Sequence, residues 1–259
     1  MSTPCFVANW KMNKGIAEAD DYLRILEKKW PQLSGLPSRT ILAPSFTALP
    51  FVSEFLKRSS LEVDLAAQNV HYEREGAYTG EISPSMLRGV GCRYVIIGHS
   101  ERRRLFGETD AQIHLKLDAA VKAGLNPILC VGETLQERRE GKTWAVLERQ
   151  LREAFGGNFI EETGDFSGHI IAYEPVWAIG TGQTANPGDA ESVHQRIKTF
   201  ISEGTKRGVP HVLYGGSVTE NNIEALMKEA HVDGVLVGGS SLSAESFLKI
   251  IKLGAAVKN

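Results

Sequence analysis

The sequence predicts an α/β protein folded as a single (β/α)8 barrel that spans residues 1–259. Eight short apolar runs alternate with longer segments whose apolar residues recur at helical spacing, which is typical of parallel strands joined by helices. The runs are apolar at consecutive positions, as expected for strands covered on both faces. A chain of this length, without a linker or low-complexity tract, matches the usual size of one closed barrel.

Each apolar run is short enough to be a strand, and most are followed directly by a glycine or a polar residue. In chain order the predicted strands are Cys5–Ala8, Thr40–Ala43, Val63–Ala67, Tyr94–Gly98, Asn126–Val131, His169–Tyr173, Val212–Tyr214 and Gly234–Val237.

The segments between the runs carry signals for the start and end of helices. Asp110 supplies a capping carboxylate for a helix that stops before Gly124, and Pro187 opens another helix near its first turn. The predicted helices are Ala17–Trp30, Asp110–Ala123, Thr143–Phe155, Pro187–Ser202, Asn221–Lys228 and Ala244–Leu253, with weaker helical pieces at Glu54–Lys57 and Pro84–Leu87.

Composition argues against several classes of protein. Lysine and arginine number 29 and aspartate and glutamate 31, so a net charge of −2 does not favour nucleic acid or an anionic membrane. No apolar run reaches the roughly 18 residues that span a bilayer, and Met1–Cys5 lacks the features of a signal peptide. Cys5, Cys92 and Cys130 lie in or beside apolar runs, as reduced core thiols do. We therefore expect a cytoplasmic protein.

Polar residues and glycine pairs follow several predicted strands at their carboxyl ends. Glu174 follows the sixth strand and precedes Pro175 and Trp177 in a loop closed by glycines. The others are Asn9 and Lys11 after the first strand, His99 after the fourth, Gly215-Gly216-Ser217 after the seventh and Gly238-Gly239 after the eighth. In a parallel barrel these ends share one face, where barrel enzymes keep their active sites and often hold phosphate after strands seven and eight.

Each of these residues also has a purely structural interpretation. Lys11 could be a solvated surface lysine, His99 a structural histidine and Glu174 an ion-pair partner, while glycine pairs usually mark tight turns. Their common placement at strand ends favours a site over four separate coincidences.

The residue types indicate the chemistry of that site. Glu174 can take a proton from carbon, and Lys11 can balance an oxyanion or a phosphate. A helix beginning near Ser100 would disfavour protonation of His99, which could then donate a hydrogen bond to a carbonyl oxygen. The seven histidines are scattered, and no Walker loop or Gly-x-Gly-x-x-Gly motif is present, so no metal and no cofactor is expected. The pattern favours acid–base chemistry on a small phosphorylated carbonyl compound.

Six motifs, in this order and spacing, make the chain resemble the triosephosphate isomerase family over essentially its whole length. They are Ala8–Asn13, Ile97–Arg103, Cys130–Glu133, Ala172–Gly182, Tyr214–Val218 and Val237–Gly239. That family has the TIM-barrel fold and interconverts dihydroxyacetone phosphate and D-glyceraldehyde 3-phosphate. The resemblance implies the same cofactor-free reaction here, in glycolysis and gluconeogenesis.

The resemblance also implies a role for individual residues. Glu174 would be the base that moves a proton between adjacent carbons, and His99 the neutral electrophile that polarises the enediolate oxygens. Asn9 and Lys11 would bind substrate and stabilise developing negative charge. Glu101 would orient both Lys11 and the electrophile His99. The phosphate would be held by backbone N–H groups of Gly180, Ser217, Gly238 and Gly239.

By the same resemblance, residues 175–185 form a lid that shields a labile enediol phosphate from water. Ile179 and Leu236 would cover Glu174, and Tyr214 would latch the lid near Ala185. Gln183 stands where lysine is common at the trailing hinge, so the lid's kinetics are an open question.

Two further features come from the same comparison. Ser240 stands where alanine is usual, which leaves the chemistry untouched. The long loop Gly76–Glu81, with its tip near Thr79, would insert beside the active site of a second subunit, so a homodimer is expected.

Two other functions compete with this interpretation. A barrel lyase or aldolase would need a Schiff-base lysine at a strand end inside the barrel, but Glu174 occupies the sixth strand end and Lys11 lies beyond the first. A catalytically silent barrel paralogue that acts as a binding protein should have lost some of Asn9, Lys11, His99 and Glu174, and all four are present.

Overall fold

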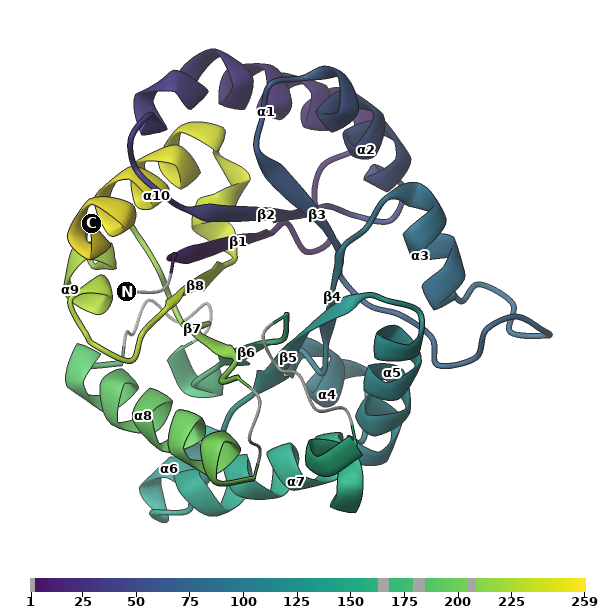
Figure 1. Cartoon of the computed structure of the whole chain (residues 1–259), viewed down its shortest axis with the longest axis vertical. Helices are drawn as coiled ribbons and strands as arrows, with labels where there is room; N and C mark the ends of the chain where they lie inside the picture. Colours follow the sequence, from purple (N-terminus) through teal and green to yellow (C-terminus); the bar gives the residue numbers. More distant parts are fainter. Residues whose placement is uncertain (1–2, 163–167, 179–184, 205–207) are drawn as a thin grey trace.

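The computed structural model describes residues 3–162, 168–178, 185–204 and 208–259, which form a closed parallel barrel surrounded by helices (Figure 1). Neighbouring strands pair in chain order, and β8 pairs with β1 to close the barrel. The strands are β1 Cys5–Asn9, β2 Arg39–Ala43, β3 Val63–Ala67, β4 Tyr94–Ile97, β5 Asn126–Val131, β6 Ile170–Tyr173, β7 His211–Tyr214 and β8 Gly234–Val237. The predicted (β/α)8 fold is confirmed, and the expected strand ends are correct to within one residue.

Helices connect successive strands around the outside of the barrel. The α-helices are α1 Ile16–Lys29, α2 Leu49–Arg58, α3 Pro84–Val90, α4 Ser100–Phe106, α5 Asp110–Lys122, α6 Leu135–Arg139, α7 Thr143–Glu162, α8 Pro187–Gly204, α9 Ile223–Met227 and α10 Ala244–Lys258. Short 3-10 helices are η1 Trp30–Leu33, η2 Val176–Ala178 and η3 Gly239–Leu242.

Helix ends were harder to predict than strand ends. The weak helical piece 54–57 is the second half of the longer α2, and α6, which Thr134 caps, was not expected. α7 was expected to end at Phe155, and Gly156 does interrupt it with φ 66° and ψ 165° before the helix resumes. Short helices without a long apolar period leave little trace in sequence.

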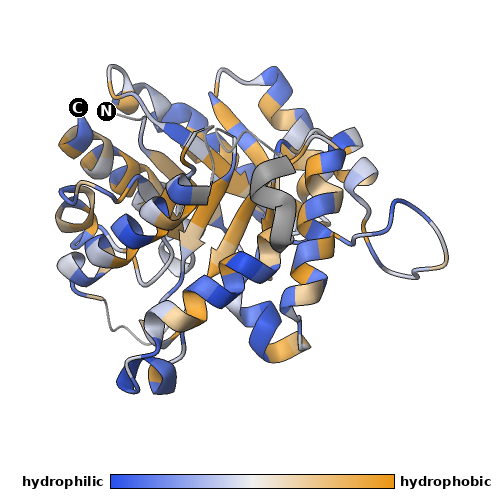
Figure 2. Cartoon of the chain, turned by 60° about the horizontal axis from the view of Figure 1, so that its bottom comes forward, coloured by the Kyte–Doolittle hydropathy of each residue, from blue (hydrophilic) through white to orange (hydrophobic). Residues whose placement is uncertain are grey.

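Buried apolar side chains form two layers separated by the strands. In β1, Cys5 and Val7 belong to the cluster inside the barrel, whereas Phe6 and Ala8 belong to the cluster between strands and helices. This alternation follows from the two-residue period of a strand. Figure 2 shows the apolar strands at the centre and mixed helices around them. Cys5, Cys92 and Cys130 are buried free thiols, as expected.

Between β3 and α3 the chain extends away from the barrel (Figure 1). Residues 73–81 of this loop are exposed, and the backbone N–H of His71 donates to the Ile82 carbonyl at 2.8 Å across its base. Thr79 lies in this exposed stretch, so the loop is available for a partner, although the expected homodimer stays a prediction.

Candidate active site

A cavity of about 170 Å³ lies among the carboxyl ends of the strands. It is lined by Asn9, Lys11, His99, Glu174, Gly215, Gly216, Ser217, Val218, Leu236, Gly238, Gly239 and Ser240. The structure therefore brings together the site residues predicted from five different strand ends. Glu101 lies beside the cavity and binds Lys11, and the predicted phosphate ligand Gly180 lies outside the described residues.

Glu174 directly follows β6, and its side chain is 2% exposed. Its Oε1 lies 2.9 Å from Nε2 of His99, and its Oε2 accepts the backbone N–H of Ser100 at 2.8 Å. Burial raises the pKa of Glu174, but the electrostatic interaction and hydrogen bond with His99, together with the N–H of Ser100, outweigh burial and lower it. The carboxylate is therefore ionised, with a donor at each oxygen.

His99 is the N-cap residue of α4, which begins at Ser100 as expected. Burial lowers the pKa of His99, but the charge of Glu174 and the hydrogen bond to it raise the pKa above its ordinary value. The expected lowering by the helix is thus wrong for this arrangement, because the sequence did not show that Glu174 contacts the ring. Nδ1 accepts the N–H of Glu101 at 3.2 Å, which requires a lone pair there. A neutral ring with its proton on Nε2 satisfies both contacts.

Lys11 has a left-handed backbone, with φ 53°, which is uncommon for a residue other than glycine. Its N–H donates to Oδ1 of Asn9 at 3.0 Å, and its Nζ lies 2.5 Å from Oε1 of Glu101. The Lys11 side chain is 27% exposed and that of Glu101 35%. Glu101 therefore positions the lysine charge, and Asn9 stabilises the unusual backbone that carries it.

Gln68 is a contributor to this corner that sequence reasoning missed. Its Nε2 donates to the carbonyl of Lys11 at 2.8 Å and to that of Ala43 at 2.9 Å. Gln68 directly follows β3, so the same strand-end rule that selected Glu174 would have found it.

Glycines at the ends of β7 and β8 leave room for the charged side chains. A Cβ atom on Gly215 would lie 2.9 Å from Cγ of Glu174, and one on Gly238 would lie 3.2 Å from Cε of Lys11. The hydroxyl of Ser240 donates to the Val218 carbonyl at 2.7 Å and so links the two glycine turns. This corner therefore combines a lysine charge with exposed backbone, as an anion requires.

The end of the predicted lid is tied to the barrel. The backbone N–H of Ala185 donates to the hydroxyl of Tyr214 at 3.1 Å, which is the contact expected of a latch. A Cβ atom on Gly216 would lie 2.3 Å from that hydroxyl. Ile179 and Gln183 lie outside the described residues, so the cover that Ile179 was expected to give Glu174 stays a prediction. Leu236, the other residue expected to cover Glu174, lines the same cavity as Glu174.

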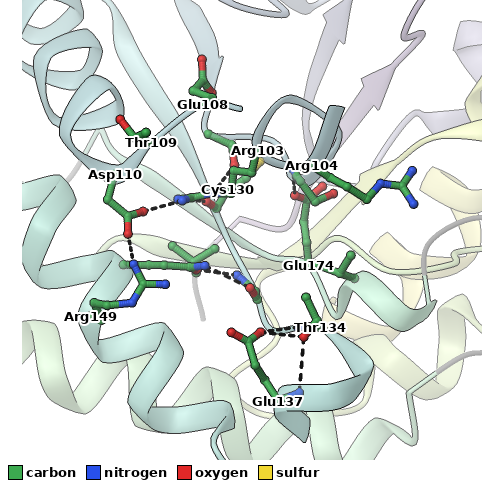
Figure 3. A pocket seen from close by; sticks show the side chains of 16 residues that line it. Arg103, Arg104, Glu108, Thr109, Asp110, Cys130, Thr134, Glu137, Arg149 and Glu174 are labelled. Atoms are coloured by element: carbon green, nitrogen blue, oxygen red, sulfur yellow. Dashed lines mark hydrogen bonds and ion pairs between the residues drawn. The ribbon is translucent and has the colours of Figure 1, made fainter. Parts of the chain in front are cut away.

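A second cavity, of about 480 Å³, lies on another side of Glu174 (Figure 3). Arg103 from α4 and Arg149 from α7 both pair with Asp110 there. Arg103 also donates from Nε to the Gly98 carbonyl at 2.9 Å, directly before His99. The cavity is lined by Arg103, Arg104 and Arg149, and acidic side chains in the same lining partly balance their charge. This cavity is therefore less suited to an anion than the first one.

Within the described part of the chain, no three histidine, cysteine or acidic side chains are placed to hold a metal ion, and no helix is long and apolar enough to cross a membrane. Fold and site together define a parallel barrel protein with an acid–base pair, a cation and glycine turns at its strand ends.

A family model described as triosephosphate isomerase matches residues 4–254, and the chain belongs to that family. It is 47% identical over 255 residues to the triosephosphate isomerase of Carboxydothermus hydrogenoformans, covering 97% of this chain and 99% of the other. It is also 47% identical over 249 residues to the enzyme of that name from Aquifex aeolicus, covering 94% and 96%. For the one from Endomicrobium trichonymphae the identity is 44% over 254 residues, covering 97% and 99%.

Proposed function

We propose that this chain is an intramolecular aldose–ketose isomerase that interconverts dihydroxyacetone phosphate and D-glyceraldehyde 3-phosphate without a cofactor. The observation that carries the proposal is the convergence of Glu174, His99 and Lys11 on one small cavity with glycine turns. Family membership over nearly the whole chain supports the same reaction.

In the proposed mechanism Glu174 takes a proton from the carbon beside the carbonyl and returns it to the neighbouring carbon. Its two oxygens now accept from His99 and Ser100, so substrate must displace at least one of these donors. A buried carboxylate that loses a donor has a higher pKa and becomes a stronger base. The proton on Nε2 of His99 is then free to bond a substrate oxygen, where negative charge develops.

Lys11 and Asn9 bind the substrate in this proposal, and the lysine charge stabilises the enediolate. Glu101 keeps Lys11 in place. Ser217, Gly238 and Gly239 contact the phosphate, and Gly180 supplies a further N–H. The approach of the Lys11 stem to Gly238 supports one shared cationic corner for the oxyanion and the phosphate.

Two finer points belong to the same proposal. The exposed loop around Thr79 supports a homodimer in which this loop contacts the second subunit. The buried reduced cysteines support action in the cytoplasm. The alternative, a silent binding protein, has less support because Asn9, Lys11, His99 and Glu174 all line the same cavity.

A coupled assay with D-glyceraldehyde 3-phosphate, without added metal or cofactor, tests the function directly. We expect turnover in the range typical of enzymes, about 1 to 1,000 per second or faster. Absence of turnover in folded protein would instead support the silent binding protein. Glu140→Gln, on the exposed end of α6, is the matched control and should isomerise normally.

A further inference from the structure

The backbone of Glu174 lies directly against the segment that follows β5. Its N–H donates to the Val131 carbonyl at 2.7 Å, and the N–H of Val176 donates to the Glu133 carbonyl at 3.1 Å. A Cβ atom on Gly132 would lie 1.7 Å from the carbonyl oxygen of Glu174. The position of residues 131–133 therefore determines where Glu174 leaves the barrel.

That segment has no strand on its other side. The pairing of β4 with β5 ends at Ile97 and Leu129, after which the chain turns into α4. Successive backbone groups of a strand face opposite neighbours, so Gly132 directs its own N–H and carbonyl toward the place that β4 has left. Backbone N–H and carbonyl groups that are shielded from water without a partner are costly, so another donor and acceptor must take the place of the missing strand.

Gln150 of α7 takes that place with both ends of its amide. Its Oε1 accepts the N–H of Gly132 at 2.8 Å, and its Nε2 donates to the carbonyl of Gly132 at 3.1 Å. The side chain is 5% exposed, so water competes little for these bonds. A single side chain thus pairs with Gly132 as a neighbouring strand would.

We propose that Gln150 is a positioning residue for the catalytic base Glu174, acting through Gly132. The inference rests on the proposed isomerase function, in which small shifts of the base matter. A catalytic group misplaced by about 1 Å can lose on the order of 100-fold in rate. Among the described residues the hydrogen bonds of the Gln150 side chain go to Gly132 and not to the substrate-binding residues Lys11, Ser217 and Gly238, so we expect substrate binding to be unaffected.

The test compares Gln150→Met, which keeps the length and removes both hydrogen bonds, with wild type and with Gln136→Met. Gln136 lies exposed on α6, where its amide donates to Glu140. We expect kcat of Gln150→Met to fall about 10- to 100-fold with KM within about twofold. The primary deuterium isotope effect on kcat, with substrate labelled at the carbon that Glu174 deprotonates, should rise because proton transfer becomes slower. Gln136→Met should match wild type.

A second variant, Gln150→Glu, keeps the side-chain volume and the oxygen that accepts the N–H of Gly132. It tests the same inference if Gln150→Met does not fold. It loses the donor to Gly132 while ionised, and a protonated carboxyl regains it, so its activity relative to wild type should recover as the pH falls. Folded variants with unchanged kcat and isotope effect, or with a raised KM alone, would overturn the inference. Wild type without isomerase activity would instead refute the proposed function itself.

Discussion

Glu174 and His99 meet inside the carboxyl-terminal end of the barrel, while Asp233 and Lys198 meet at its amino-terminal end. Both pairs are close, at 2.9 Å between Glu174 and His99 and 2.7 Å between Asp233 and Lys198. The first pair faces a cavity and can exchange its partners. The second is anchored to the backbone, since Asp233 also accepts the N–H of Val212 at 2.8 Å and so joins β7 to the start of β8. The same interaction type thus serves reactivity at one end and fold stability at the other.

The largest expected effect is at the reactive end. Glu174→Gln removes the base but preserves its shape, so kcat should fall about 100- to 10,000-fold. The variant should stay folded, with a free energy of unfolding in urea lower by about 1 to 3 kcal/mol, because its amide nitrogen faces one of the two donors that the carboxylate accepted. Near-normal kcat in the coupled assay would contradict the assignment of the base.

At the fixed end the balance should reverse. Asp233→Asn leaves Lys198 without its counterion, which we expect to cost about 3 kcal/mol in the free energy of unfolding. The kcat of the folded variant should stay within about twofold of wild type. Glu54→Gln, which breaks an exposed pair with Arg58, should cost no more than about 1 kcal/mol. Urea denaturation measures the stabilities of Glu174→Gln, Asp233→Asn and Glu54→Gln. A large loss of kcat in folded Asp233→Asn would contradict the division between a reactive pair and a structural pair.

His194 in α8 makes the stability of the fold depend on pH. Its side chain is fully buried, and burial lowers its pKa from 6.5 to about 4. The unfolded chain therefore binds a proton that the folded chain does not, so stability is complete above pH 6.5 and falls as the pH drops toward 4. Between pH 7 and pH 5 the expected loss is about 2 kcal/mol. Denaturation curves of wild type and His194→Asn at pH 7 and pH 5 check this. The free energy of unfolding of the variant should fall by about 2 kcal/mol less than that of wild type between the two pH values. Equal losses in the two proteins would show that His194 is not the cause.

The smallest effect belongs to Glu101, whose pair with Lys11 is partly exposed. Glu101→Gln keeps a hydrogen-bond acceptor for Lys11, so kcat/KM should fall only about 3- to 10-fold. Raising the salt concentration should lower the kcat/KM of wild type toward that of the variant, because ions screen the attraction between Glu101 and Lys11. A salt-independent difference would show that Glu101 acts otherwise than through its charge.

Strand ends carried most of what the sequence could predict. Apolar runs located β1 to β8, and the rule that parallel strands share a face placed Asn9, His99 and Glu174 together. The contact of Glu101 with Lys11 came only from the family resemblance, and the contacts of Gln68 and Gln150 were missed. Gln150 lies in the middle of α7, where nothing in the sequence distinguishes it from a solvent-exposed glutamine. Its two hydrogen bonds to Gly132 depend on how α7 packs against the barrel.

The direction of the His99 pKa shift was mispredicted for a related reason. The start of α4 at Ser100 could be located in the sequence. The contact between His99 and Glu174 joins residues 75 positions apart, and it reverses the net direction of the pKa shift. Local signals thus predicted local structure, whereas the electrostatics of the site depend on distances that only the folded barrel determines.

Gly216 makes room for the Tyr214 hydroxyl that accepts the N–H of Ala185. A side chain at residue 216 would have to push this hydroxyl aside, and Ala185 would lose its acceptor without any change in its own loop. The two loops therefore cannot be redesigned independently. An engineer who grafts a different segment over 175–185 must carry Tyr214 and Gly216 with it, or supply a new acceptor for the backbone at its far end.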